Sequence, residues 1–201
     1  MICVCDLETT SRNVFDAEII HGSFFALDDD LNVVSEFELR CNPIKYSDDA
    51  YAVHGISKEE CSQYPRFVHE APKLIAWFKQ NKITEFWCHA NATMFGKVTY
   101  YDWAVLRMNL FNLGNDAYYS LALSKVFSTH SLCKYFQSEI NSQSLKLAQI
   151  CSSLGIELQH HNARSDALAC IQLMKRFLHR VTREELTNND RGVDNGHDGA
   201  L

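Results

Sequence analysis

The chain has 201 residues, enough for one domain with a sizeable core, and its 46% hydrophobic and 22% charged residues are ordinary for a globular protein. No apolar run approaches the roughly 20 residues that cross a bilayer, so we expect no membrane partner. The net charge is −6, with 15 acids and 9 bases in residues 1–100 but 5 acids and 9 bases in residues 101–183; this argues against a protein that coats duplex nucleic acid, although an acidic half can also be a solvated face.

The first three predicted elements are strands. Ile2–Cys5 is apolar and has no basic segment ahead of it, so it is expected to be a core strand and not a signal peptide. Residues 18–27 are rich in β-forming side chains, and three aspartates at 28–30 indicate a hairpin turn. Residues 32–41 alternate between polar and apolar side chains, as an antiparallel third strand would.

The middle of the chain is predicted to alternate between helices and strands. Residues 42–57 have the composition of a loop, and Ser57 with Glu60 forms a capping box for a following helix. Helical spacing of apolar residues over 71–78 predicts another helix. A fourth strand over 85–89 is followed by a polar loop at 90–99 and by a helix whose apolar face runs from Trp103 to Leu113.

The last third is predicted to hold a short strand and two helices. The strand covers 125–129, one helix covers 145–154 with Gly155 as its C-cap, and the final helix has its apolar face over 167–181. We therefore expect an α/β domain over residues 1–182, with a mixed sheet flanked by helices. Residues 183–201 are polar, so we expect a disordered tail that is dispensable for activity.

The eight cysteines are scattered and form no Cys-x-x-Cys pair, which argues against a structural zinc site. We expect buried free thiols in a reducing compartment, the cytoplasm. Phe24 and Phe25 are likewise expected in the core rather than as stacking platforms for bases.

Three groups of polar residues are candidates for chemistry. Asp6 and Glu8 lie two residues apart at the end of the first strand, so both carboxylates can face one point and offer the oxygen ligands that Mg²⁺ prefers. By itself this pair more often marks an ordinary solvated strand end. Asp102 precedes the helix of Trp103, where an aspartate is usually an N-cap.

The third group is at the start of the last helix. Asn162 is a candidate N-cap, which would place Asp166 in the early turns of the helix and His161 just outside it. A surface histidine pair, His160 and His161, at a polar helix start is the simpler alternative.

Taken together, these groups resemble the DEDDh branch of the DnaQ-like 3′→5′ exonucleases. Asp6 and Glu8 match the first motif, Asp102 the second, and His161 with Asp166 the third. Further similarity lies in Asp-Leu-Glu-Thr-Thr at 6–10, Glu-Ile-Ile-His-Gly at 18–22, His-Gly-Ile-Ser at 54–57 and Leu-Gly-Ile at 154–156, so the resemblance spans about residues 1–180. One departure is the stretch 89–101, which is longer than the family's compact second motif; Asp116 is the only nearby substitute for Asp102.

The resemblance implies a ribonuclease H-like fold with a five-stranded sheet and a two-metal mechanism. Two Mg²⁺ or Mn²⁺ ions about 4 Å apart would be held by Asp6, Glu8, Asp102 and Asp166, with Asp6 bridging both. His161, rather than His160, would be the general base for the attacking water, and the product would be a nucleoside 5′-monophosphate. Similar segments of the family hold the terminal nucleotide, which suggests substrate-binding roles for Leu7, Thr9, His54, Gly55 and Ile56.

The expected partner is the 3′ end of single-stranded nucleic acid. We favour single-stranded DNA. Exoribonuclease action (3′→5′) on short RNA is the near alternative, because a two-metal site does not itself contact the 2′-hydroxyl that distinguishes RNA from DNA. A non-catalytic nucleic-acid-binding scaffold of the same fold is the alternative of a different class. Arg164 fits either a phosphate contact or a solvated arginine.

Overall fold

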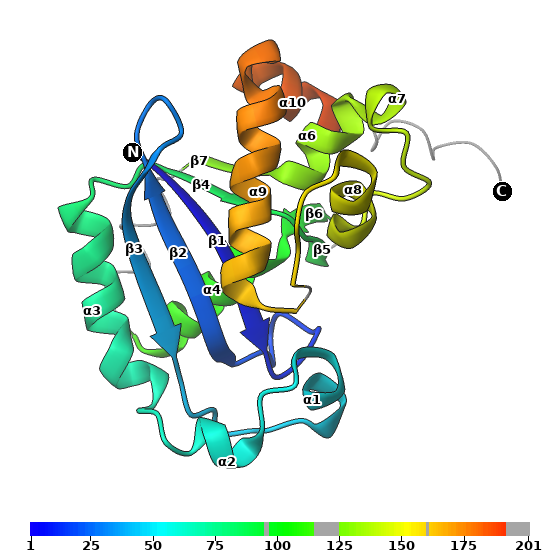
Figure 1. Cartoon of the computed structure of the whole chain (residues 1–201). Coiled ribbons are helices and arrows are strands. Elements are labelled where there is room, and N and C mark those ends of the chain that lie inside the picture. The colour runs from blue at the N-terminus through cyan, green and yellow to red at the C-terminus, as the bar shows by residue number, and fades with distance from the viewer. Residues whose placement is uncertain (95–96, 115–124, 160, 192–201) are drawn as a thin grey trace, which may run out of the picture.

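The computed structural model describes residues 1–94, 97–114, 125–159 and 161–191. Its centre is a mixed five-stranded sheet in the order β3-β2-β1-β4-β7, which confirms the expected ribonuclease H-like architecture (Figure 1). Its strands are β1 (Ile2–Thr9), β2 (Ile19–Leu27), β3 (Val33–Arg40), β4 (Glu85–Cys88) and β7 (Lys125–Ser128). The first three strands pair antiparallel, whereas β4 is parallel to both β1 and β7.

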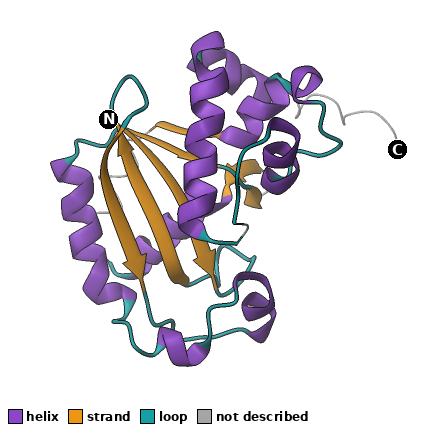
Figure 2. Cartoon of the chain, in the orientation of Figure 1, coloured by secondary structure: helices purple, strands orange, loops and turns teal. Residues whose placement is uncertain are grey.

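Helices cover both faces of the sheet because successive residues of β1 point to opposite sides (Figure 2). Cys3, Cys5 and Leu7 pack in one core with α3 (Phe67–Gln80) and α4 (Tyr101–Asn112). Val4 packs in the other core, which the remaining covering helices complete: α6 (Thr129–Tyr135), α7 (Gln137–Ile140), α8 (Leu147–Leu154) and α9 (Ala163–Phe177). The middle of β1 is therefore buried between two helical layers, and its carboxyl end opens into a cleft.

Several local predictions are confirmed. Ser57 caps α2 (Lys58–Cys61) by accepting a hydrogen bond from the Glu60 N–H, and Gly155 ends α8 in the left-handed conformation. Phe24 and Phe25 are buried in opposite cores. All eight cysteines are buried and free, as expected. Within the described ranges no helix has the length and apolar character needed to cross a membrane.

Two segments predicted as loops contain regular structure. α1 (Asp48–His54) lies within residues 42–57, and because it has no buried residue it leaves no apolar periodicity to detect. The segment 90–99 contains two antiparallel strands, β5 (Asn91–Met94) and β6 (Lys97–Tyr100), instead of a loop. The last long helix ends at Phe177, and a 3₁₀ turn (Leu178–Arg180) follows it.

The prediction of a disordered tail is wrong for its first nine residues, which form α10 (Arg183–Arg191). Its anchor is Leu186, which is 1% exposed in the core beside α9. Arg183 adds an ion pair to Glu85 at 3.1 Å and lies over the ring of Trp87. A single apolar anchor gives almost no sequence periodicity, so tertiary packing rather than local pattern forms this helix. Residues 192–201 lie outside the described residues.

Because α10 is docked through Leu186, we expect Leu186→Ala to lower the free energy of unfolding by about 2 kcal/mol, as truncation of a buried leucine does. Urea denaturation measures this change. Glu184→Ala removes an exposed side chain from the same helix and is expected to stay within about 0.5 kcal/mol of the wild type. Equal stabilities of the two variants would show that α10 does not contribute to the fold.

Candidate functional site

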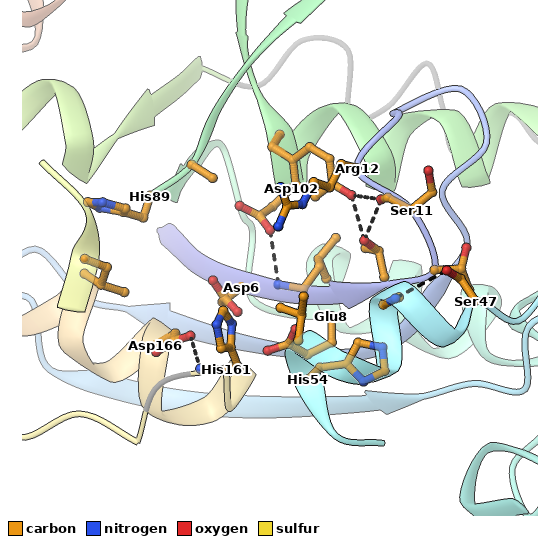
Figure 3. A pocket seen from close by; sticks show the side chains of 18 of the residues that line it. Asp6, Glu8, Ser11, Arg12, Ser47, His54, His89, Asp102, His161 and Asp166 are labelled. Atoms are coloured by element: carbon orange, nitrogen blue, oxygen red, sulfur yellow. Dashed lines mark hydrogen bonds between the residues drawn. The ribbon is translucent and has the colours of Figure 1, made fainter. Parts of the chain in front are cut away.

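A cleft of about 800 Å³ opens at the carboxyl end of β1 (Figure 3). Its walls come from β1 and the loop after it, from α1, from the first turn of α4 and from the starts of α8 and α9. All four carboxylates and the histidine singled out from the sequence line it: Asp6, Glu8, Asp102, His161 and Asp166.

Three of the carboxylates form a tight cluster. Asp6 and Glu8 extend from the same face of β1, two residues apart, and Asp166 comes from the first turn of α9. One ligand oxygen from each lies within 4.8 Å of the others. The alternation of the strand thus brings the first pair together, and the packing of α9 on β1 adds the third.

The start of α9 places Asp166 rigidly. Asn162 caps the helix by accepting a hydrogen bond from the Ser165 N–H at 3.1 Å, as predicted. The backbone N–H of His161 donates to Asp166 Oδ2 at 3.2 Å. This bond connects the turn that carries His161 directly to the carboxylate cluster.

Asp102 is not the N-cap that the sequence suggested. α4 begins at Tyr101, so Asp102 lies in its first turn, and it is only 2% exposed. Its Oδ1 accepts a hydrogen bond from the Leu7 N–H at 3.2 Å, whereas its Oδ2 is buried and has no hydrogen-bonding partner among the described residues. Asp102 stands outside the three-carboxylate cluster but faces the same cleft.

The unusually long stretch before Asp102 does not displace it. The Tyr101 N–H donates to the carbonyl of Ala90 at 2.9 Å, so the chain returns to the end of β4 after the β5–β6 hairpin. The helix of Asp102 therefore starts beside the strand that precedes the hairpin. Asp116, the substitute considered from the sequence, lies outside the described residues.

Burial, reinforced by the neighbouring carboxylates, disfavours negative charge on Asp6, Glu8 and Asp102. Burial, with further contributions from Asp102, Asp166 and Glu8, raises the pKa of Asp6 well above its ordinary value. Burial and the charges of Asp166 and Asp102 raise the pKa of Glu8 to about 7. Burial also raises the pKa of Asp102 to about 7, although hydrogen bonds from the Leu7 N–H and its own N–H oppose the rise. The protein thus collects negative charge that requires a compensating partner.

This donor set fits hard divalent cations. The cluster offers only oxygen ligands within 4.8 Å, which suits Mg²⁺ or Mn²⁺ better than a soft metal. The unpartnered Oδ2 of Asp102 is a further acceptor that a cation or a water on it would satisfy. Asp6, Glu8 and Asp166 are therefore the residues suited to hold a metal, with Asp102 beside them.

His161 lies at the edge of the cluster. It is exposed and has a left-handed backbone with φ of 62°, and Figure 3 shows its imidazole turned toward Asp6. His160 lies outside the described residues, so the structure does not compare the two histidines.

The expected substrate contacts are only partly brought to the cleft. Leu7, Thr9 and His54 line it, whereas Gly55 and Ile56 do not. Gly55 instead ends α1 with φ of 69°, and the Ile56 N–H donates to His54 Nδ1 at 3.0 Å. With Nδ1 accepting, the proton of a neutral His54 is on Nε2, which has no partner among the described residues.

The structure assigns Arg164 a role and shows further cleft residues that the sequence did not indicate. Arg164 forms a two-pronged ion pair with Glu36 at 2.7 and 3.0 Å, so it serves the fold. Arg12, His89 and Lys146 line the cleft although no motif marked them. The sequence placed His89 at the end of a predicted strand and Lys146 near the start of a predicted helix, and it gave no signal for Arg12.

Comparisons with known proteins agree with this geometry. Residues 3–174 match the RNase_T family, described as Exonuclease. No curated protein sequence matches the chain. E. coli exonuclease I in its zinc-bound complex with single-stranded DNA superposes with a TM-score of 0.75 at 17% identity, over 93% of this chain and 42% of that one. Its complex with a dT13 oligonucleotide gives a TM-score of 0.74 at 18% identity over the same shares.

These structural likenesses establish the fold, and the chain spans about two-fifths of the length of the exonuclease I chains it matches. The family assignment rests on the sequence match, which covers most of the chain and includes Asp6, Glu8, Asp102, His161 and Asp166. This chain therefore belongs to the exonuclease family, in its DEDDh branch with a ribonuclease H-like fold.

Proposed function

We propose that the protein is a 3′→5′ exonuclease that removes nucleoside 5′-monophosphates from single-stranded DNA in the presence of Mg²⁺ or Mn²⁺. The observation that carries the proposal is the cluster of Asp6, Glu8 and Asp166, with ligand oxygens within 4.8 Å at the floor of an 800 Å³ cleft. The neighbouring exonuclease I structures with single-stranded DNA support DNA as the substrate.

The residues of the cleft have different roles in the proposed reaction. Bound divalent cations would neutralise the carboxylates and lower the pKa of a water molecule, which is the chemistry a two-metal site supplies. Asp6, Glu8 and Asp166 would hold these cations, whose positive charge would fix the reacting phosphate, and Asp102 aligns the end of β1 through the Leu7 N–H. The imidazole of His161 accepts the proton from the attacking water as general base.

The end of the cleft beside α1 suits the terminal nucleoside. Val53 supplies exposed apolar surface there, and the buried Nε2–H of His54 is a donor without a partner among the described residues. Thr9 lies beside Tyr101, with their hydroxyl oxygens 2.6 Å apart. We infer that a nucleoside placed against α1 is the last of its strand, which is the arrangement an exonuclease requires.

The proposal is tested by incubating the protein with 5′-labelled DNA and RNA oligomers and Mn²⁺. A ladder that shortens from the 3′ end, absent in EDTA, is the expected result for DNA. Equal or faster degradation of RNA would identify an exoribonuclease, and binding without cleavage of either would identify a scaffold.

We expect Asp6→Asn to lower turnover more than about 100-fold, because it removes a charged ligand from the cluster while the side-chain size is kept. Mn²⁺ should raise the melting temperature of the wild type but not of this variant. Asp49→Asn is the matched control, since Asp49 is an exposed carboxylate that lines the cleft outside the cluster. A wild-type rate in the folded Asp6→Asn protein would overturn the site assignment.

The metal-free stability should depend on pH through Glu8. In the folded protein its pKa is about 7, above its ordinary value of 4.5, so the folded state binds the Glu8 proton more tightly than the unfolded state does. The resulting contribution to the free energy of unfolding is fully present below pH 4.5 and is lost as the pH rises through 7. In EDTA, the free energy of unfolding of Glu8→Gln relative to the wild type should therefore increase from pH 5 to 7 and level off above. Taking the difference between the two free energies of unfolding removes the contribution of the histidine titrations, which both proteins share. A difference that stays constant from pH 5 to 7 would show that Glu8 is not desolvated.

The base is tested with His161→Asn, because asparagine tolerates the left-handed backbone that His161 adopts. We expect single-turnover hydrolysis at saturating Mn²⁺ to slow by about 10²–10⁴-fold without loss of the Mn²⁺-induced melting shift. His160→Asn is the neighbouring control and should change the rate far less. A larger loss in the His160 variant would reverse the assignment.

A further inference from the structure

Two long cationic side chains line the cleft, Arg12 and Lys146. Lys146 is exposed and has no ion pair or side-chain hydrogen bond within the described part of the chain. Elsewhere, four arginines pair with glutamates: Arg40, Arg164, Arg180 and Arg183. An unpaired lysine beside a carboxylate-rich cleft is therefore available to a phosphate ligand.

A buried hydrogen-bonded chain holds the backbone next to Lys146. The Nε2 of His89 lies 3.0 Å from the carbonyl of Leu145, which can only accept, so Nε2 carries the proton and donates. Nδ1 is then an acceptor for the Thr129 hydroxyl at 2.9 Å. His89 is 8% exposed, and burial lowers its pKa to about 4, so it stays neutral and keeps this arrangement.

The hydrogen bonds from Thr129 through His89 to Leu145 place Lys146 at one end of the cleft. In Figure 3, His89 lies on one side of Asp6, Asp102 and Asp166, whereas His54 and Ser47 lie on the other. Lys146 directly follows Leu145, the residue to which His89 is bonded, so it belongs to the His89 end. If the terminal nucleoside lies against α1 and the reacting phosphate over the carboxylates, the remaining strand leaves past Lys146.

We propose that Lys146 binds a backbone phosphate of the strand upstream of the cleaved linkage, and that His89 positions it by holding Leu145. The proposal rests on the proposed function, because it takes its strand direction from the terminal nucleoside site. The ammonium contributes affinity for a phosphate that a dinucleotide without a 5′ phosphate does not possess. The site thereby favours strands over the shortest products of degradation.

The test compares Lys146→Ala with wild type on a DNA dinucleotide without a 5′ phosphate, whose only phosphate is the one cleaved, and on a ten-nucleotide DNA strand. We expect KM for the longer strand to rise about tenfold with kcat unchanged, as for loss of one charge-assisted contact. The dinucleotide kinetics should not change. The dependence of log affinity on log salt should weaken by about 0.7, the value for one phosphate contact on a single strand.

Lys125→Ala is the matched control, since it removes an exposed lysine of β7 that does not line the cleft. The positioning role is tested with His89→Gln and His89→Asn. Glutamine carries an amide N–H as far as the Nε2 position and can still donate to Leu145, whereas asparagine reaches only the Nδ1 position. We expect glutamine to keep the wild-type KM on the longer strand and asparagine to reproduce the Lys146→Ala increase, with both retaining dinucleotide turnover.

A wild type without metal-dependent cleavage would overturn the proposed function itself. An active wild type with Lys146→Ala indistinguishable from Lys125→Ala would overturn only the phosphate contact. An equal loss on the dinucleotide and on the longer strand would also overturn it, because Lys146 would then act at the cleaved linkage.

Discussion

The burial of several carboxylates together at the end of β1, reinforced by their mutual repulsion, is the constraint on which the rest of the site depends. Burial and neighbouring negative charge raise the pKa of Asp6, Glu8 and Asp102 together. Such a set persists only because a strand between two hydrophobic cores and helices packed on each face hold it in place. Rigidity supplied by the cores is therefore what makes a charged, metal-seeking site possible.

The two carboxylates that come from helices both lie in a first turn and both accept a backbone N–H, Asp166 from His161 and Asp102 from Leu7. Asp166 gains from the first turn of α9, where the Asn162 cap leaves the helix start well ordered. One oxygen of Asp102 accepts a hydrogen bond from the Leu7 N–H, so this cleft residue also connects α4 to β1. A substitution of Asp102 is therefore expected to change both the charge of the cleft and the packing of α4 against β1. Asp6 and Glu8 differ from it because they belong to β1 itself.

Much of this arrangement could be predicted from the sequence. The strand pattern, the Ser57 and Asn162 caps and the position of Asp6 and Glu8 follow from local chemistry, and the five strands of the main sheet were all predicted. The misses share a cause: α1 has no buried residue, and α10 has the single anchor Leu186, so neither shows periodicity. His89 and Lys146 were missed because their relation depends on a hydrogen bond to Leu145 across 56 residues of chain.

The β5–β6 hairpin leaves and re-enters the fold at one point, since the Tyr101 N–H is bonded to the Ala90 carbonyl. In evolutionary terms, the segment between these residues behaves as an insertion site whose length is decoupled from catalytic geometry. Loop length adds little to the free energy when the ends stay joined. A change in the length of this excursion is therefore expected to leave Asp102 in its position.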